Sequence, residues 1–242
     1  MKNQTDQLFQ RYLETYQAIQ QIDVLEGAFP EQIAAIRDVH RLKIFFCTRR
    51  AAKTYTGGLY LVDEALKYDY SNGMYLGLTR QSAKDIAWKD VLEVIDRKFQ
   101  LGMKKNLTEL TMTSGNGSII ALTGIDATQD EMNKLLGRKY RLVIIDEASL
   151  YTIDLNKLVY GILKPAMSDQ GGTIVLSGTS SNFTRGLFYE VTKLLQGETK
   201  GVFRVADWNV HAWTTHDNPY NAKSWQKELD EIDLDRPQFK LT

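Results

Sequence analysis

The sequence has little of what a secreted or membrane protein needs. Its 242 residues include one cysteine, Cys47, so neither an internal disulfide nor a cysteine-based zinc site can form. No apolar run approaches the roughly 20 residues of a membrane-spanning helix, and residues 1–21 lack the apolar stretch of a signal peptide. We therefore expect a soluble, intracellular protein without a membrane partner.

Net charge is also absent. Thirty Lys and Arg residues balance thirty Asp and Glu residues, so any contact with nucleic acid must use a local patch. The three histidines, His40, His211 and His216, do not have the spacing of zinc ligands on a helix, which argues against a catalytic zinc ion. Hydrophobic residues make up 43% of the chain, which excludes wholesale disorder.

The hydrophobic pattern predicts an α/β protein. Apolar residues at helical spacing indicate an amphipathic helix near the N-terminus, and Pro30 suits the first turn of a second helix. Short apolar runs then alternate with longer periodic segments, which is typical of a mainly parallel sheet flanked by helices. The expected strands are residues 42–46, 74–78, 107–112, 118–122, 141–145, 173–176 and 201–206. The expected helices are residues 1–22, 30–39, 53–67, 81–100, 155–163, 185–195 and 221–232.

One turn signal interrupts the alternation. Residues 114–117, Ser-Gly-Asn-Gly, separate two strand-like runs, and Asn-Gly favours a hairpin in which both central residues have positive φ. We therefore expect a β-hairpin insertion in the sheet. We assign residues 1–27 to the N-terminal helix and lead-in, residues 28–210 to the core, and residues 211–242 to a C-terminal helical segment.

The first candidate site is the loop at residues 47–54, between a predicted strand and a predicted helix. A phosphate-binding loop needs backbone N–H groups at a helix N-terminus, a lysine for the phosphates and a hydroxyl for Mg²⁺. Lys53 and Thr54 fit the last two roles. Cys47 and Ala52 replace the usual glycines, which we expect to be tolerated if neither position requires positive φ. Ordinary surface cations beside a strand would give the same pattern.

A second motif follows the predicted strand at residues 142–145. The strand is apolar and leads directly into Asp146 and Glu147. In a nucleotide-hydrolysing site of the Walker B type, such an Asp holds Mg²⁺ and the adjacent Glu orients and deprotonates the attacking water. An acidic pair that merely begins a helix is the alternative interpretation. A third element, Ser177-Gly178-Thr179, ends another apolar strand, where a simple turn would have the same composition.

Taken in order, residues 49–54, 143–148 and 176–179 resemble the large terminase subunit of tailed bacteriophages. That family has a deviant phosphate loop with basic residues before the lysine, a Walker B motif ending in Asp-Glu-Ala, and a Ser-Gly-Thr coupling motif. Residues 75–84 with Trp88, and Asn218-Pro219-Tyr220, are similar to other segments of the family. The resemblance implies a P-loop NTPase fold of the ASCE, RecA-like type and an ATPase that uses ATP and Mg²⁺.

The resemblance also implies roles for individual residues. Lys53 and Thr54 would bind phosphate and Mg²⁺, Asp146 would bind Mg²⁺ through water, and Glu147 would be the catalytic carboxylate. Arg49 would act on the γ-phosphate in cis, and Arg138 is the candidate for an arginine supplied to a neighbouring subunit, with Arg80 and Arg141 as competitors. Gln32 would read the adenine edge, and residues 177–179 would couple hydrolysis to motion. The loop residues expected to contact nucleotide are Thr48, Arg49, Arg50, Ala51, Ala52, Lys53 and Thr54.

The implied function is to drive double-stranded DNA into a preformed capsid from the cytoplasm of the infected bacterial host. The implied partners are the portal protein, a small terminase subunit and like subunits in a ring, pentameric by resemblance. The chain ends at Thr242, where the family's ATPase domain would end, so we expect its nuclease domain to be absent. Two alternatives stay open at this point: a helicase-like, nucleic-acid-dependent ATPase, and a nucleotide-binding assembly module that does not hydrolyse ATP.

Overall fold

The computed structural model describes residues 22–125, 139–151, 153–180, 184–195 and 200–221, together with Gln7 and Gln10. The predicted N-terminal helix and the predicted helix at residues 221–232 lie outside this part of the chain, apart from single residues. Arg138 also lies outside it. No helix among the described residues is long and apolar enough to cross a membrane.

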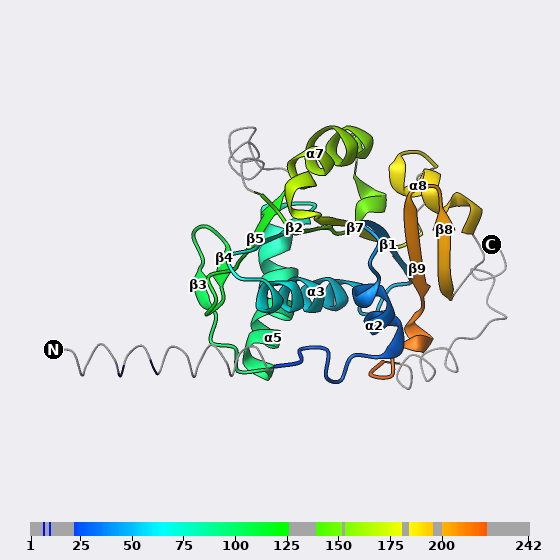
Figure 1. The fold of residues 1–242 in the computed structure, drawn as a ribbon. Coiled ribbons are helices and arrows are strands. Elements are labelled where there is room, and N and C mark those ends of the chain that lie inside the picture. The colour runs from blue at the N-terminus through cyan, green and yellow to red at the C-terminus, as the bar shows by residue number, and fades with distance from the viewer. Residues whose placement is uncertain are drawn as a thin grey trace.

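A nine-stranded sheet forms the centre of the molecule, in the order β3-β4-β5-β2-β6-β7-β1-β9-β8 (Figure 1). Six adjacent strands pair in parallel: β5, β2, β6, β7, β1 and β9. The strands at the two ends of the sheet, β3 and β4 at one end and β8 at the other, pair antiparallel. The mainly parallel α/β sheet is therefore as predicted. The strands are β1 (Leu42–Cys47), β2 (Asn72–Gly77), β3 (Lys104–Asn106), β4 (Thr111–Thr113), β5 (Ile119–Gly124), β6 (Leu142–Ile145), β7 (Thr173–Gly178), β8 (Gly201–Val205) and β9 (Trp208–Trp213).

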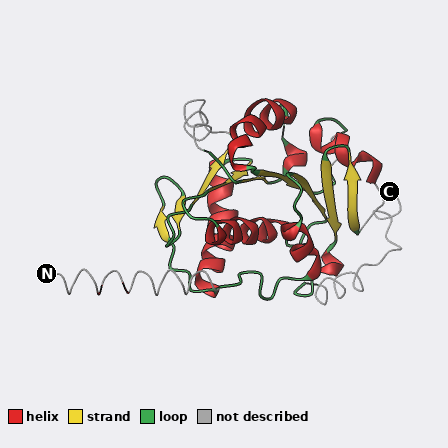
Figure 2. Ribbon diagram, viewed as in Figure 1, coloured by secondary structure: helices red, strands yellow, loops and turns green. Residues whose placement is uncertain are grey.

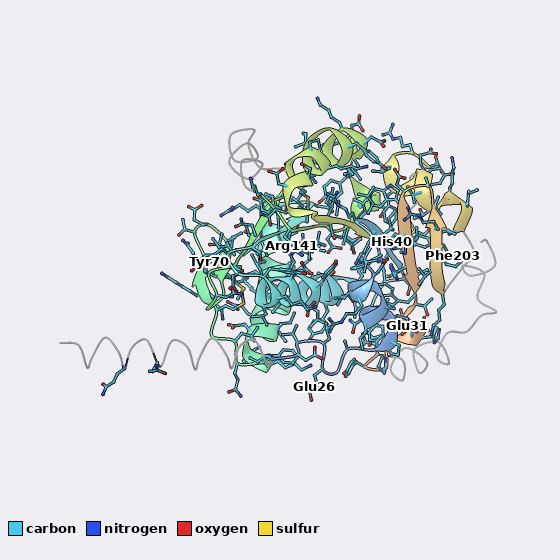
Figure 3. The ribbon with its side chains drawn as sticks, viewed as in Figure 1. Glu26, Glu31, His40, Tyr70, Arg141 and Phe203 are labelled. Atoms are coloured by element: carbon cyan, nitrogen blue, oxygen red, sulfur yellow. The ribbon has the colours of Figure 1, made fainter. Side chains whose placement is uncertain are left out.

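Helices cover both faces of this sheet (Figure 2). One face packs against α2 (Pro30–Arg37), α3 (Lys53–Lys67), the π-helical segment η1 (Ala83–Leu92) and α5 (Glu93–Lys98). The other face packs against the π-helical η3 (Lys157–Leu163) and α8 (Leu187–Thr192), and side chains fill both layers (Figure 3). The remaining short helical elements are α4 (Arg80–Ser82), α7 (Lys164–Ala166), η2 (Ala148–Leu150), η4 (Ser168–Gln170), η5 (Lys193–Leu195) and η6 (Thr215–Asp217).

The predicted hairpin is present, but its turn differs from the expected one. Strands β4 and β5 pair antiparallel, and β3 adds a third strand. The predicted strand at residues 107–112 is wrong over residues 107–110, which form a turn between β3 and β4. Gly117 has φ +82°, whereas Asn116 is not among the residues with positive φ, so the expectation for Asn116 is wrong. Its side chain is buried instead, and the amide donates to the carbonyl of Ala65 at 2.9 Å. The turn is thus anchored to the end of α3 by a tertiary contact.

The predicted boundary between the core at residue 210 and a helical segment from residue 211 falls inside β9. This strand pairs in parallel with β1 and antiparallel with the edge strand β8, and all six of its residues are buried. A strand buried on both faces lacks the alternation that marks a half-buried one. Its two polar members, Asn209 and His211, both contact Asp38, at 2.9 Å and 2.7 Å. The prediction therefore ended the core too early.

A buried lysine lies in the same region of the sheet. Lys43 in β1 is fully buried, and its ammonium group donates to the carbonyl of Ala35 at 3.1 Å and to the hydroxyl of Tyr60 at 3.0 Å. Burial lowers the pKa of Lys43 from 10.5 to about 8, against the opposing charges of Asp38 and Glu64. In the unfolded chain Lys43 keeps its proton up to a higher pH than in the folded protein. The free energy of unfolding should therefore rise as the pH increases from 8 toward 10.

We predict that Lys43 makes the unfolding free energy pH-dependent in this range. Between pH 7.5 and pH 9.5, the wild type should gain about 2 kcal/mol relative to Lys43→Met, which carries no titratable group at this position. Urea unfolding of both proteins at matched pH values measures the difference. A difference that stays constant across the range would contradict the lowered pKa.

Candidate active site

The candidate residues come together at the carboxyl ends of three adjacent strands. Strand β7 lies between β1, which leads into the loop, and β6, which leads into the acidic pair. The crevice outside the carboxyl ends of parallel strands is where open α/β sheets bind ligands. The sequence placed the three motifs far apart along the chain, and the strand order brings them side by side (Figure 1).

Two side-chain contacts join the loop to the acidic pair. The ammonium group of Lys53 lies 2.6 Å from Oε1 of Glu147, and the hydroxyl of Thr54 donates to Oδ2 of Asp146 at 3.1 Å. The side chains of Lys53 and Glu147 are 11% and 33% exposed, so this ion pair is only partly screened by solvent.

Side chains from other segments donate hydrogen bonds to the carbonyl groups of the loop at residues 47–54. Trp213 Nε1 donates to the carbonyl of Ala51 at 2.7 Å, and Asn218 Nδ2 donates to that of Arg50 at 3.0 Å. The hydroxyl of Thr215 donates to the carbonyl of Arg49, and that of Thr56 donates to the carbonyl of Ala52 at 2.9 Å. In a trans peptide the N–H points opposite to the C=O. The N–H groups of residues 50–53 therefore point away from the donors that hold these carbonyl groups.

Three residues of the site have left-handed backbone conformations. Arg50 has φ +59°, Ala52 has φ +63°, and Glu147 has φ +53°. The expectation that the glycine-free loop avoids positive φ is thus wrong for Ala52, which begins α3 in this conformation. Such residues cost about 1–3 kcal/mol each and persist only where the surrounding structure imposes them. The hydrogen bonds from Trp213, Thr215 and Asn218 to the loop carbonyl groups supply that constraint.

Cys47 is buried in β1, and burial raises the pKa of its thiol.

Asp146 has the features of a metal ligand. Its carboxylate is buried, and Oδ2 accepts hydrogen bonds from Thr54 and from the hydroxyl of Tyr75. Oδ1 is buried and has no hydrogen-bond partner among the described residues. A buried carboxylate oxygen without a partner is costly, and a hydrated Mg²⁺ is a ligand that would satisfy it. Burial raises the pKa of Tyr75, and the charge of Asp146 raises it further, so the phenol stays a donor.

Gln32 lines a cavity of about 320 Å³. Its Nε2 donates to Thr56 at 2.9 Å and its Oε1 accepts from the N–H of Phe29 at 3.3 Å. Ala52 and Tyr55 line the same cavity, so it adjoins the phosphate loop. The cavity is therefore placed to receive a group attached to a bound phosphate. The role of Gln32 toward adenine stays a prediction.

The other predicted residues have different surroundings. Thr48, Arg49 and Arg50 are exposed at the loop. Ser177 is buried next to Phe45 of β1, and its hydroxyl has no hydrogen-bond partner within the described ranges. A Cβ atom on Gly178 would come within 2.9 Å of the Phe188 ring, so packing explains this glycine. Thr179 is partly buried after the strand ends.

Sequence reasoning missed the residues that hold the site from outside. The sequence places Trp213 and Thr215 in a predicted helical segment, Asn218 only within a resemblance to a family, and indicates no role for Tyr75. Each acts on the loop or on Asp146 from another element. The one available signal was the run at residues 208–213, whose aromatic and β-branched members favour a strand.

Comparison with solved structures finds similar folds at low sequence identity. The Thermus phage P74-26 large terminase ATPase domain is 15% identical with a TM-score of 0.58, covering 86% of this chain and 89% of that one. The large terminase from the thermophilic bacteriophage D6E is 14% identical with a TM-score of 0.63, covering 82% of this chain and 50% of that one. The D6E protein in complex with ATP-gamma-S is 15% identical with a TM-score of 0.59, covering 84% and 48%.

These likenesses show the fold alone: a mainly parallel α/β sheet flanked by helices, shared with the terminase structures. The chain spans about half the length of the D6E large terminase. No protein-family model matches the chain, and no curated protein matches it.

We predict that Ala52→Gly stabilises the protein, because glycine adopts positive φ without strain. After the larger entropy of glycine in the unfolded chain is subtracted, the gain should be up to about 1 kcal/mol. Ala51→Gly is the matched control, since Ala51 is buried and is not among the positive-φ residues. That variant should be destabilised by about 1 kcal/mol. Chemical unfolding measures both, and equal losses in the two variants would contradict the assigned loop conformation.

Proposed function

We propose that this chain is the Mg²⁺-dependent ATPase domain of a phage large terminase, the motor that drives double-stranded DNA into a capsid. The observation that carries the proposal is the contact of Lys53 and Thr54 with Glu147 and Asp146 across the strand order of the sheet. The likeness in fold to solved terminase ATPase domains supports it.

The proposed chemistry divides the work among these residues. The N–H groups of residues 50–53 and the Lys53 ammonium hold the β- and γ-phosphates. Glu147 takes a proton from water as the water oxygen attacks the γ-phosphorus and the bond to the bridging oxygen breaks, releasing ADP and phosphate. Arg49 neutralises charge that develops on the γ-phosphate. Thr54 and Asp146 would hold Mg²⁺, which when bound supplies positive charge to the phosphate oxygens.

The Lys53–Glu147 ion pair bears on whether Glu147 can act as a base before nucleotide binds. The Lys53 ammonium lies 2.6 Å from Glu147, and a bound phosphate is a second anion that draws on the same ammonium. Nucleotide and Glu147 therefore compete for Lys53, and phosphate binding releases the carboxylate to act as a base. Without nucleotide the catalytic carboxylate is held by the lysine.

The partners follow the same proposal. The chain acts in a ring of like subunits at the portal, with a small terminase subunit, in the cytoplasm of the infected bacterium. Arg138 is supplied to the neighbouring subunit, residues 177–179 couple hydrolysis to movement, and Gln32 selects adenine. The pentameric ring size is part of this proposal.

A basic cavity of about 210 Å³ is an observation that favours a phosphate-bearing partner such as DNA. Arg41, Lys164 and Arg204 line it with one carboxylate, Asp207, at the edge of the sheet where β1, β7 and β9 begin. Among the described residues Lys164 and Arg204 form no ion pair, in contrast to Lys89 and Lys105, which pair with Asp85 and Asp96. Because the chain has no net charge, a local concentration of cations is what DNA binding requires.

Both alternatives give different behaviour. A helicase-like ATPase would unwind duplexes and would need a second domain of the same type. A nucleotide-binding assembly module would bind ATP without releasing phosphate. The carboxylate of Glu147 beside Asp146 and within reach of the loop favours hydrolysis.

We predict that Glu147→Gln keeps ATP affinity, or raises it, because the competing carboxylate for Lys53 is removed. Steady-state phosphate release should fall about 100-fold or more, since the base is lost. Lys53→Ala should instead lose nucleotide binding. Phosphate release and calorimetric binding of ATP-gamma-S measure the two effects. Hydrolysis unchanged in Lys53→Ala would rule out the site, and wild-type binding without phosphate release would favour the assembly module.

We predict that Lys164→Gln combined with Arg204→Gln weakens binding to a 30-base-pair duplex. The slope of log affinity against log salt should become shallower by about 1 to 2, because each phosphate contact contributes about 0.9. Fluorescence anisotropy over a salt series measures the slope, and Lys89→Gln is the control. An unchanged slope would place DNA elsewhere, and no duplex binding by the wild type would contradict the DNA motor.

A further inference from the structure

Tyr75 has no role in the proposed hydrolysis, yet it contacts the proposed metal ligand directly. Its hydroxyl lies 2.5 Å from Oδ2 of Asp146, and the residue is 3% exposed. A buried phenol needs a hydrogen-bond partner, and this carboxylate accepts from it.

The sheet register explains why these two side chains meet. Tyr75 of β2 pairs with Ile144 of β6, and the N–H of Asp146 donates to the carbonyl of Leu76 at 2.9 Å, extending the ladder past the end of β6. Asp146 is two residues beyond Ile144, so its side chain lies on the same face of the sheet as Tyr75. Diagonal neighbours of this kind are within reach of an aromatic side chain.

The two oxygens of the Asp146 carboxylate are treated differently by their surroundings. Oδ2 accepts from both Thr54 and Tyr75, which belong to two different elements, α3 and β2. Oδ1 is buried and accepts nothing from the described residues. Two donors on one oxygen fix the rotation of the carboxylate group, and the other oxygen is left for a ligand.

We propose that Tyr75 is a positioning residue for the metal site: by holding Oδ2 it presents Oδ1 of Asp146 toward the nucleotide-bound Mg²⁺. The inference rests on the proposed function, because it takes Asp146 as the metal ligand. Tyr75 does not touch the reacting atoms, so its removal acts on metal affinity. Loss of a partner that orients a metal ligand typically lowers metal affinity about 10- to 100-fold.

The test uses Tyr75→Phe and Mn²⁺ as a paramagnetic probe for the metal. Free Mn²⁺ is measured by electron paramagnetic resonance in the presence of saturating ADP. The Kd for Mn²⁺ should rise about 10-fold or more, while ADP affinity in EDTA stays at the wild-type value. Tyr151→Phe is the matched control, because Tyr151 is a nearby tyrosine whose hydroxyl donates to the carbonyl of Leu76 and not to the carboxylate. Its Mn²⁺ affinity should stay unchanged.

A double-mutant cycle separates positioning from a general loss of structure. In an Asp146→Asn background, Tyr75→Phe should have no further effect on Mn²⁺ affinity, because there is no carboxylate left to orient. An equal further loss in that background, or a loss of ADP binding in EDTA, would assign Tyr75 a purely structural role and overturn the proposal. Unchanged Mn²⁺ affinity in Tyr75→Phe, with normal binding by the wild type, would overturn this inference alone. If the wild type retained no Mn²⁺ with ADP, the proposed metal site would fail as well.

Discussion

The candidate site depends on one contact: the loop at residues 47–54 meets Asp146 and Glu147 across strand β7. Lys53 and Thr54 begin α3 after β1, and Asp146 and Glu147 follow β6, with β7 between them. This strand order places the two carboxylates opposite the lysine and the hydroxyl. The helices on both faces bury the sheet, so its carboxyl-end edge is held as one surface.

The loop conformation is imposed by its neighbours and not by its own residues. A loop without glycine at residues 47–54 contains two left-handed residues, Arg50 and Ala52, each of which is unfavourable by itself. Trp213 and Asn218 hold the carbonyl groups of this loop from behind, and β9 supports them beside β1. Hydrogen bonds from another segment of the chain therefore replace the conformational freedom that glycine normally provides.

Elements with strong local patterns could be predicted from the sequence. Helix α3 matches its predicted bounds at residues 53–67, and the apolar run at residues 142–145 forms β6 as expected. The motif residues were found because lysine, hydroxyl and paired carboxylates have specific chemical uses. Features that depend on partners distant in sequence could not be found this way: the burial of Lys43 and the contact of Tyr75 with Asp146. The position of Arg138 lies outside the described residues.

The most direct measurement is a crystal structure of this chain with ATP-gamma-S and Mg²⁺. The phosphates should lie in front of the N–H groups of residues 50–53, with the Lys53 ammonium moved from Glu147 to a phosphate oxygen and the metal beside Oδ1 of Asp146. Nucleotide bound elsewhere, or bound at the loop with the Lys53–Glu147 ion pair intact, would contradict the proposed competition for the lysine.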